Sequence, residues 1–418
     1  MGISQESHGN FTGISSISQE KRRNKKKIPH SKQTLSVFLH IVNQNTCILA
    51  SQLAVVLILL LPLSSASADD GGFIRQVTDG RSRAGTGPGL LPEAQFAVFV
   101  RRHRRRYSKP KEYARRLRVF AANLARAAAH QALDPIARHG VTPFSDLTQE
   151  EFEARLTGVR AGGDVQRLVM SGAPAAPPAS QEEVARLPAS FDWRDKGVVT
   201  GLKMQGACGS CWAFTTTGAV EGTNFLATGK LLDLSEQQLV DCDHTCSAVA
   251  QNECNNGCTS GLMTNAYAYL MKSGGLMEQR AYPYTGAPGP CRFDPAQAAV
   301  RVANFTAVPV GDEAQIRTAL VRRGPLTVGL NVAFMQTYVG GVSCPLLYPR
   351  AWVNHGVLLV GYGACGFATL RLGYRTYCII KNSWGKQWGE QGYYRLCRGS
   401  NVCSVDSMVS AVAVAPAP

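Results

Sequence analysis

The stretch Gln205-Gly206-Ala207-Cys208-Gly209-Ser210-Cys211-Trp212 decides the fold, because it joins a glycine-rich turn to an apolar, helix-compatible run. A cysteine just inside the start of a helix is chemically unusual, since the positive end of the helix dipole lowers the pKa of its thiol. Only the thiolate is a good nucleophile. Cys211 is therefore a candidate for covalent catalysis.

Two other interpretations of this stretch stay open on these residues alone. A Cys-x-x-Cys pair can bind zinc or act as a redox dithiol. A buried cysteine can also be no more than a small hydrophobic side chain. The rest of the sequence decides between them.

The net charge of +15 over 418 residues raises the question of a nucleic-acid partner. The charge is uneven, however. From Leu187 onward there are 18 Lys and Arg against 14 Asp and Glu, and most of the surplus lies upstream, in Lys21–Lys27 and Arg101–Arg106. No basic strand interleaved with aromatic residues accompanies it, so we expect no nucleic-acid partner.

The cysteines indicate an oxidising compartment, since twelve of the thirteen lie between Cys208 and Cys403. If one of the twelve is a free nucleophile, eleven remain. At least one more cysteine then cannot pair within the chain.

The N-terminal region predicts entry into the secretory pathway. A polar, lysine-rich segment precedes the apolar run Leu53–Leu63, which is short for a membrane span of about 20 residues. Ala66-Ser67-Ala68 then has the small-x-small pattern of a signal cleavage site. We predict a signal peptide cut near Asp69; an uncleaved anchor is the alternative.

The motif around Cys211 resembles that of a known family. Cys208 to Trp212 matches at every position the C-G-[SA]-C-[WY] signature around the nucleophile of papain and the cathepsins. The chain resembles papain-like cysteine proteases, and most of all the cathepsin F-like vacuolar cysteine proteinases of plants. The resemblance covers about residues 93 to 410.

Upstream residues resemble the propeptide of the same family, although their pattern alone would also fit an ordinary helical hairpin. Gly140–Asp146 resembles its G-x-N/T-x-F-x-D motif. The resemblance implies an inhibitory propeptide that runs backwards through the cleft of the enzyme. Six residues along one expected helix match the family's ERFNAQ motif: Glu112, Arg116, Phe120, Asn123, Ala127 and Gln131.

A nucleophilic cysteine needs a base, and the base needs an orienting group. The resemblance assigns these roles to His355, 144 residues after Cys211, and to Asn382, 171 residues after it. It also implies that Gln205 and the backbone N–H of Cys211 stabilise the oxyanion. Trp384 is expected to border the cleft and to shield the Asn–His hydrogen bond from water.

The chain divides into three expected parts: residues 1–68, an N-terminal extension with the signal peptide; 69–186, a propeptide with a core of about 93–160; and 187–418, the mature peptidase. We expect an α+β, papain-like two-lobe fold, with a helix-rich lobe, a β-barrel-like lobe and a cleft between them, preceded by the helical propeptide. The segment from Ala161 to about Arg186, which contains a proline- and alanine-rich run, should stay extended and be cut near Leu187-Pro188.

The resemblance also implies an apolar pocket for P2, the second substrate residue before the scissile bond. No acid is present there to hold arginine, so we expect bulky apolar residues at P2. Gly261 should pair with the substrate backbone, although Ser260 replaces a family glycine beside it, which puts efficiency in doubt. The expected lining is Leu262, Met263, Gly329, Val353 and Met408.

Disulfides are favoured over a zinc site for the remaining cysteines of a secreted chain. The pairing of Cys365, Cys378 and Cys397 is left open, and Asn304-Phe305-Thr306 is a candidate glycosylation site at Asn304. By resemblance the expected bonds are Cys208–Cys258, Cys242–Cys291, Cys344–Cys403 and Cys246–Cys254.

The sequence thus predicts a cysteine endopeptidase made as a secretory zymogen, acting in a vacuole- or lysosome-like compartment or outside the cell. The alternative is a catalytically weak homologue that acts as a binding or inhibitory module. We expect no cofactor, no metal and no stable membrane association. The expected partners are polypeptide substrates, the chain's own propeptide and cystatin-type inhibitors, and the expected state is a monomer.

Overall fold

The computed structural model describes residues 91–415, apart from 251, 350–351 and 369–372. The predicted signal peptide lies outside the described residues. Within the described part, no helix combines the length and the apolarity needed to cross a membrane.

The described part of the propeptide begins with two helices, each with proline in its first turn, where the missing N–H costs nothing. Phe96, Phe99 and Phe120 are buried between them. The propeptide elements are α2 (Pro92–Arg102), α3 (Pro110–Leu133), β1 (Ala137–His139), α4 (Gln149–Leu156), β2 (Ala161–Gly162), α5 (Gly163–Ser171) and α6 (Gln181–Ala185).

The ERFNAQ residues tie α3 to the second propeptide motif. Arg116 Nε lies 2.7 Å from Glu112 Oε1 on the same helix, and Arg116 Nη1 lies 2.6 Å from Glu151 Oε2 on α4. Asn123 donates from Nδ2 to the carbonyls of Ser145 and Leu147 at 2.9 and 2.8 Å. Because the motif residues lie on one face of α3, their side chains together fix the loop that leads toward the cleft.

The first half of the peptidase is helical, as the sequence predicts. The central helix α7 is apolar on nearly every side and is buried over most of its length, which is typical of a core helix. Its helices are α7 (Cys211–Thr228), α8 (Glu236–Cys242) and α9 (Met263–Ser273), with a short 3-10 turn, η1 (Arg194–Lys196), before them.

The second half is built on a sheet in which nine strands are described, in the order β1-β8-β12-β11-β10-β7-β13-β6, with β3 paired to β10. The propeptide contributes β1, whose Ala137 lies opposite Gly341 of β8. The strands are β3 (Phe191–Asp192), β6 (Val302–Ala307), β7 (Leu326–Leu330), β8 (Tyr338–Ser343), β10 (His355–Ala368), β11 (Gly373–Lys381), β12 (Tyr393–Cys397) and β13 (Met408–Val414).

Small elements complete this half. Helix α10 (Glu313–Arg323) packs on β13, and β2 of the propeptide pairs with β9 (Trp352–Val353). The remaining elements are β4 (Leu276–Met277), β5 (Ala298–Val300), η2 (Pro295–Gln297) and η4 (Val402–Ser404).

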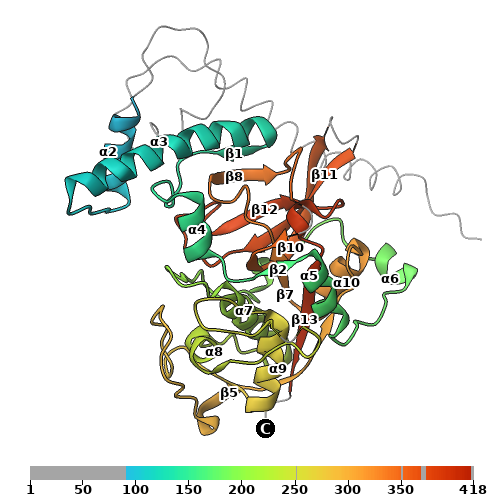
Figure 1. Cartoon of the computed structure of the whole chain (residues 1–418). Coiled ribbons are helices and arrows are strands. Elements are labelled where there is room, and N and C mark those ends of the chain that lie inside the picture. Colours follow the sequence, from blue (N-terminus) through green and yellow to red (C-terminus); the bar gives the residue numbers. More distant parts are fainter. Residues whose placement is uncertain (1–90, 251, 350–351, 369–372, 416–418) are drawn as a thin grey trace, which may run out of the picture. The chain divides into compact units, whose positions relative to one another are not determined.

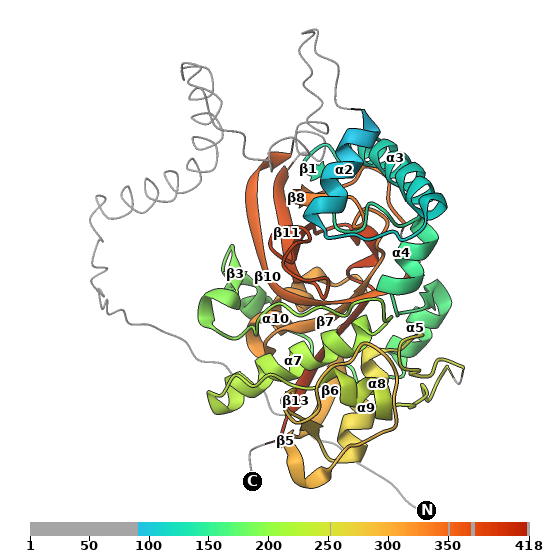
Figure 2. The same ribbon diagram turned by 90° about the vertical axis from the view of Figure 1, so that its left-hand side faces the viewer.

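Figure 1 shows α7 between the sheet and the helices α8 and α9, so the two halves meet at the start of this helix. Figure 2 shows the propeptide elements α3, α4 and α5 following one another along one side, from the sheet toward the helical half. The propeptide therefore crosses the junction of the two lobes.

The expectation that residues 161–186 stay extended is wrong. They contain α5 and α6, and Ala176 between them is buried in the core. Ala176 N–H donates to Ala307 O at 2.7 Å, and Ala307 N–H donates to Pro174 O at 2.7 Å. The segment is ordered because it hydrogen-bonds to the otherwise open edge of β6, a tertiary contact that composition does not reveal.

Candidate active site

Cys211 is the first residue of α7 and is fully buried. Two bonds hold the turn before it. Cys208 is joined to Cys258, and the hydroxyl of Tyr284 lies 2.7 Å from Ser210 Oγ. The sulfur is thereby fixed at the positive end of a buried helix, as the sequence predicts.

His355 lies at the start of β10 and faces Asn382, just after β11. His355 Nε2 is 2.8 Å from Asn382 Oδ1, so the amide fixes one ring nitrogen and leaves Nδ1 available. The indole of Trp384 stacks on the imidazole with ring centroids 4.7 Å apart. The indole thus shields this hydrogen bond from water, as expected.

Cys211 and His355 are neighbours across the two lobes. The N–H of Gly356, the residue after the histidine, donates to Cys211 Sγ at 3.3 Å. Among the described residues, His355 Nδ1 has no hydrogen-bond partner. The unpaired nitrogen, His355 Nδ1, is thus the one that the Cys211 thiol would approach by rotating its side chain.

Burial opposes the charged form of both groups. Burial raises the pKa of the Cys211 thiol to about 11, although backbone N–H groups, among them those of Gly356 and Gly158, oppose the shift. Burial also lowers the pKa of His355 to about 4, against the effect of Asn382. Gly158 belongs to the propeptide, so the propeptide backbone contacts the thiol.

Gln205 is buried beside the nucleophile. Its Oε1 accepts a hydrogen bond from Ser383 Oγ at 2.6 Å, which turns Nε2 toward the cleft. Nε2 donates to Cys208 O at 2.8 Å and to Leu156 O of the propeptide at 3.2 Å. The expected oxyanion donor is therefore already bonded to a propeptide carbonyl.

The propeptide crosses the cleft as an extended segment after α4. Gly261 N–H donates to Gly158 O at 2.8 Å, and Val159 N–H donates to Asn354 O at 3.1 Å. Ala161 pairs with Val353 in a two-stranded sheet. Gly261 thus binds a peptide backbone, the role expected of it toward substrate.

Two of the expected P2 residues, Val353 and Met408, lie beside Gly329. Met408 lies opposite Gly329 in the β13–β7 pairing, and a Cβ added to Gly329 would lie 2.7 Å from Val353 Cγ1. Leu262 and Met263 are buried in the same apolar cluster. The depth of the pocket therefore depends on the absence of a side chain at position 329.

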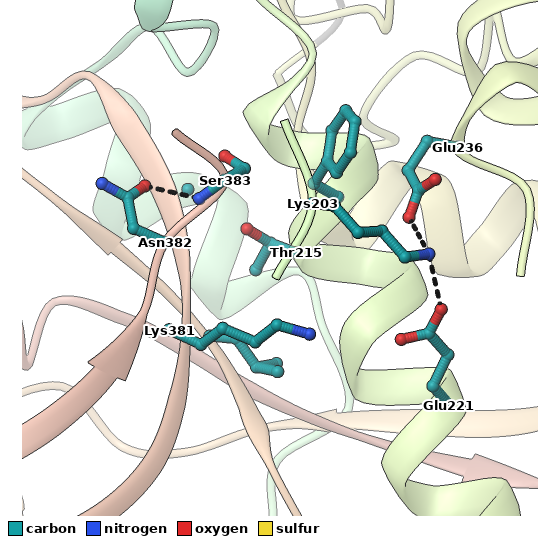
Figure 3. A pocket seen from close by; sticks show the side chains of 10 residues that line it. Lys203, Thr215, Glu221, Glu236, Lys381, Asn382 and Ser383 are labelled. Carbon is teal, nitrogen blue, oxygen red and sulfur yellow. Dashed lines mark hydrogen bonds and ion pairs between the residues drawn. The ribbon is translucent and has the colours of Figure 1, made fainter. Parts of the chain in front are cut away.

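A cluster of buried charges lies behind Asn382, between the lobes. Figure 3 shows Lys203 between two carboxylates, with its Nζ 2.8 Å from Glu221 and 2.6 Å from Glu236. Lys381, the residue before Asn382, donates to Thr200 Oγ1 at 2.9 Å.

The charges of this cluster largely balance. Burial alone would lower the pKa of Lys203, but the charges of Glu236 and Glu221 outweigh burial and raise it. Burial raises the pKa of Glu236, and the charge of Glu221 adds to that effect. The cluster links the lobe of Cys211 to the strand that carries Asn382.

Three of the four expected disulfides are present: Cys208–Cys258, Cys242–Cys291 and Cys246–Cys254. The fourth expectation is wrong, because Cys344 bonds to Cys397 and Cys403 is a buried free thiol.

The physical reason is strand pairing. Ser343 of β8 lies opposite Leu396 of β12, which places the next residues, Cys344 and Cys397, side by side. Cys378 is also free, and the side chain of Cys365 lies outside the described residues.

The remaining expected sites are simple to place. Asn304 is exposed on β6, as a glycosylated residue must be. Among the described residues, no group of three or more His, Cys, Asp or Glu side chains could hold a metal ion.

The sequence reasoning did not single out Leu156, Gly158 or Tyr284. Leu156 and Gly158 are recognised only from the path of the propeptide. Tyr284 donates to Gln205 O at 2.8 Å, a contact for which the sequence carries no signal.

Comparisons with known proteins agree with this geometry. Residues 187–413 match the model of the papain family of cysteine proteases, and residues 96–152 match the cathepsin propeptide inhibitor domain (I29). The chain belongs to the papain family of cysteine proteases. It is a zymogen of this family, and its I29 propeptide is an intramolecular inhibitor of the papain-like domain.

Similar proteins include Probable cysteine protease RD19D of Arabidopsis thaliana, 58% identical over 81% of this chain and 91% of that protein. Cysteine proteinase 1 of Zea mays is 50% identical over 85% of this chain and 96% of its own length. Among solved structures, digestive procathepsin L 3 of Tenebrio molitor has a TM-score of 0.64 at 35% identity, covering 78% of this chain and 99% of that one. None of these supports the alternative of a non-catalytic papain homologue.

Proposed function

We propose that Cys211 is the nucleophile and His355 the general acid and base of a cysteine endopeptidase. The single observation that carries this proposal is the 2.8 Å contact between His355 Nε2 and Asn382 Oδ1 at the N-terminal end of the helix that begins with Cys211. The contact leaves Nδ1 for the thiol and fixes the ring that must hold the proton.

The reaction follows from these positions. Once the propeptide has left, water and the helix dipole favour the thiolate–imidazolium pair over the two neutral groups. The thiolate attacks the peptide carbonyl, the C–N bond breaks, and His355 gives its proton to the leaving amine. Water, deprotonated by His355, then hydrolyses the thioester and restores the thiol.

Gln205 Nε2 and the N–H of Cys211 are the proposed oxyanion donors. The bond from Ser383 to Gln205 Oε1 supports this role, because it holds the amide so that its N–H group faces the cleft. Loss of such a donor typically lowers kcat by about 10²–10³-fold.

The proposed P2 preference is for bulky apolar residues, because the side chains expected to line the pocket, Leu262, Met263, Val353 and Met408, are all apolar and buried. Burying a leucine side chain is worth about 1.5–3 kcal/mol, whereas an unpaired guanidinium would be desolvated at a cost.

Maturation completes the proposal. We place the propeptide at residues 69–186 and the cut near Leu187, in a secretory compartment that is vacuolar, lysosome-like or extracellular. Cystatin-type inhibitors are the proposed partners of the mature enzyme, which we propose to be monomeric.

The test compares two peptide substrates that differ only in Leu or Arg at P2, cleaved by the acid-matured enzyme. We expect a kcat/KM at least about tenfold higher for Leu, and no cleavage of either peptide by the Cys211→Ala variant. Equal cleavage, or faster cleavage of the Arg peptide, would contradict the specificity; activity of Cys211→Ala would contradict the nucleophile.

A further inference from the structure

The basic stretch Arg101–Arg106 has no role in the protease mechanism. The contacts of the fold only partly account for two of its arginines, Arg102 and Arg105. Arg105 contacts Asp146, with Nε 3.1 Å from Oδ2. Arg102 is the last residue of α2, where the helix dipole stabilises a positive charge. It makes no ion pair with any described residue.

A pocket of about 420 Å³ lies beside this stretch, between the propeptide and the peptidase. Its volume is in the range of small-molecule sites. The propeptide contributes Arg102, His103 and Arg138, and the peptidase contributes Lys386 and Gln387. Because the two parts supply separate walls, the complete pocket exists only while the propeptide is docked.

The charges that line the pocket are of one sign. Arg102, Arg138 and Lys386 have no carboxylate partner among the described residues, and no Asp or Glu lines the pocket. The nearest acid in the peptidase loop, Glu390, is engaged by Arg395 at 2.6 Å. Its position at a helix end accounts for Arg102 only. The other two cations, Arg138 and Lys386, lie on separate elements.

His103 gives a second, independent observation. Its ring packs on Phe99 with centroids 4.9 Å apart, and its Nδ1 is shielded from solvent without a hydrogen-bond partner among the described residues. The groups that face it are Arg102, Arg105, Asp146 and Gln387. A shielded ring nitrogen without a partner at the wall of a cationic pocket can, when protonated, donate a hydrogen bond to an anion.

We propose that this pocket binds a compact polyanion with several phosphate esters on a small ring, of the inositol polyphosphate class, and that the ligand holds the zymogen in its latent form. Clustered cations from three elements suit several phosphate groups better than one. The walled pocket favours a compact ligand over a long polysaccharide.

The consequence for activation follows from mass action. A ligand that contacts both the propeptide and the peptidase binds the docked state more tightly than the separated parts. Propeptide release should therefore slow by about 100-fold when the ligand is present at about 100 times its Kd.

The contribution of His103 to the pH dependence has a definite sign. Burial lowers the pKa of His103 to about 4, with the charges of Arg105 and Arg102 adding to the effect and Asp146 opposing it. An anion beside the ring would raise that pKa. The contribution of His103 to binding should therefore grow as the pH falls from about 7 toward about 5, while protonation of the phosphate esters, whose second pKa is about 6, acts in the opposite direction.

The experiment uses the full chain with Cys211→Ala, so that no processing occurs, and inositol hexakisphosphate as the probe in titration calorimetry. We expect one molecule bound per chain, and no binding by the mature enzyme, which lacks Arg102 and Arg138, two of the three cations. Lys386→Gln and Arg138→Gln, both at exposed positions, should each weaken binding about tenfold. Lys272→Gln, an exposed lysine of α9, is the matched control and should bind as the parent does.

Three results would overturn the proposal. The first is equal affinity of the Lys386→Gln and Lys272→Gln variants. The second is equally tight binding by the mature enzyme. The third is binding of a sulfated polysaccharide in place of the compact probe. Neither myo-inositol nor inorganic sulfate should reproduce the effect of the probe, and if either does, the multivalent phosphate assignment is wrong. Every measurement in this experiment is a measurement of binding, so its outcome does not depend on the catalytic proposal.

Discussion

The carbonyl oxygen of Leu156 in the propeptide accepts a hydrogen bond from Gln205 Nε2 at 3.2 Å. Trp384 Nε1 lies 3.3 Å from the same oxygen. A propeptide carbonyl thus occupies the donor that the proposed mechanism assigns to the oxyanion. Latency then has a second physical source, because Cys211 is fully buried and this burial raises the pKa of its thiol to about 11.

Gln205→Ala tests the oxyanion role. We expect kcat of the mature enzyme to fall by about 10²–10³-fold, because one donor to the developing negative charge is lost, with little change in KM. The measurement is steady-state hydrolysis of a P2-Leu peptide. The rate at which iodoacetamide alkylates Cys211 serves as the control, since that reaction forms no oxyanion. A kcat close to that of the parent would remove Gln205 from the mechanism.

Gly329→Ala tests the P2 pocket. The new Cβ would lie 2.7 Å from Val353 Cγ1 and 3.1 Å from Met408 Cβ, so it would fill the pocket. The kcat/KM for a P2-Leu peptide should fall by about tenfold or more, and less for a P2-Ala peptide. Gly201→Ala is the matched control, because a Cβ there meets nothing within 4 Å. Equal losses for the two peptides would contradict the assignment.

His130→Gln tests whether propeptide docking senses acid. His130 Nδ1 lies 2.7 Å from Thr337 Oγ1 of the peptidase. Burial, with the charges of His139 and Arg126, lowers the pKa of His130 from 6.5 to about 4, while Asp134 opposes the shift. Between these two pH values His130 is protonated in the released propeptide but neutral in the docked one. Docking therefore weakens as the pH falls from 6.5 to about 4.

Glutamine at this position can still hydrogen-bond but cannot titrate. The midpoint pH of autoprocessing, followed by gel electrophoresis, should move to a lower value in the His130→Gln variant. His244→Gln, at an exposed histidine of the peptidase, should leave it unchanged. If both variants keep the parent midpoint, His130 is not part of the acid response.

The pairing of Cys344 with Cys397 gives a prediction about stability. Cys397→Ser should lower the free energy of unfolding of the full chain by about 2–5 kcal/mol, because a bond that closes a long loop is lost. Cys403→Ser should cost less, since that thiol makes no bond. Urea denaturation without reductant measures both. The reverse order of the two losses would restore the pairing expected from sequence.

The sequence predicts the central helix and singles out the four side chains proposed to be catalytic, because these features are local or carry a family motif. The helix α7 (Cys211–Thr228) follows from its apolar run, and His355 and Asn382 follow from their flanking residues. The ERFNAQ spacing likewise places Glu112 and Arg116 on one helix face.

The rest depends on contacts between distant segments. Composition marks residues 161–186 as extended, but this segment contains α5 and α6, and Ala175 between them pairs with Ala307 at the edge of β6. The partner of Cys344 is set by the register of β8 on β12, which no local pattern encodes. The burial that opposes the charged forms of Cys211 and His355 also comes from the packing of distant segments, so a sequence reading of the mature site misses it.

The central claim is that Cys211 is a catalytic thiol that the propeptide covers until it is released. The most direct measurement treats the full-length precursor and the acid-matured enzyme with an epoxide probe for cysteine proteases and locates the adduct by mass spectrometry. The account predicts an adduct on Cys211 of the matured enzyme and none on the precursor. An unlabelled Cys211 after maturation, or equal labelling of the intact precursor, would contradict it.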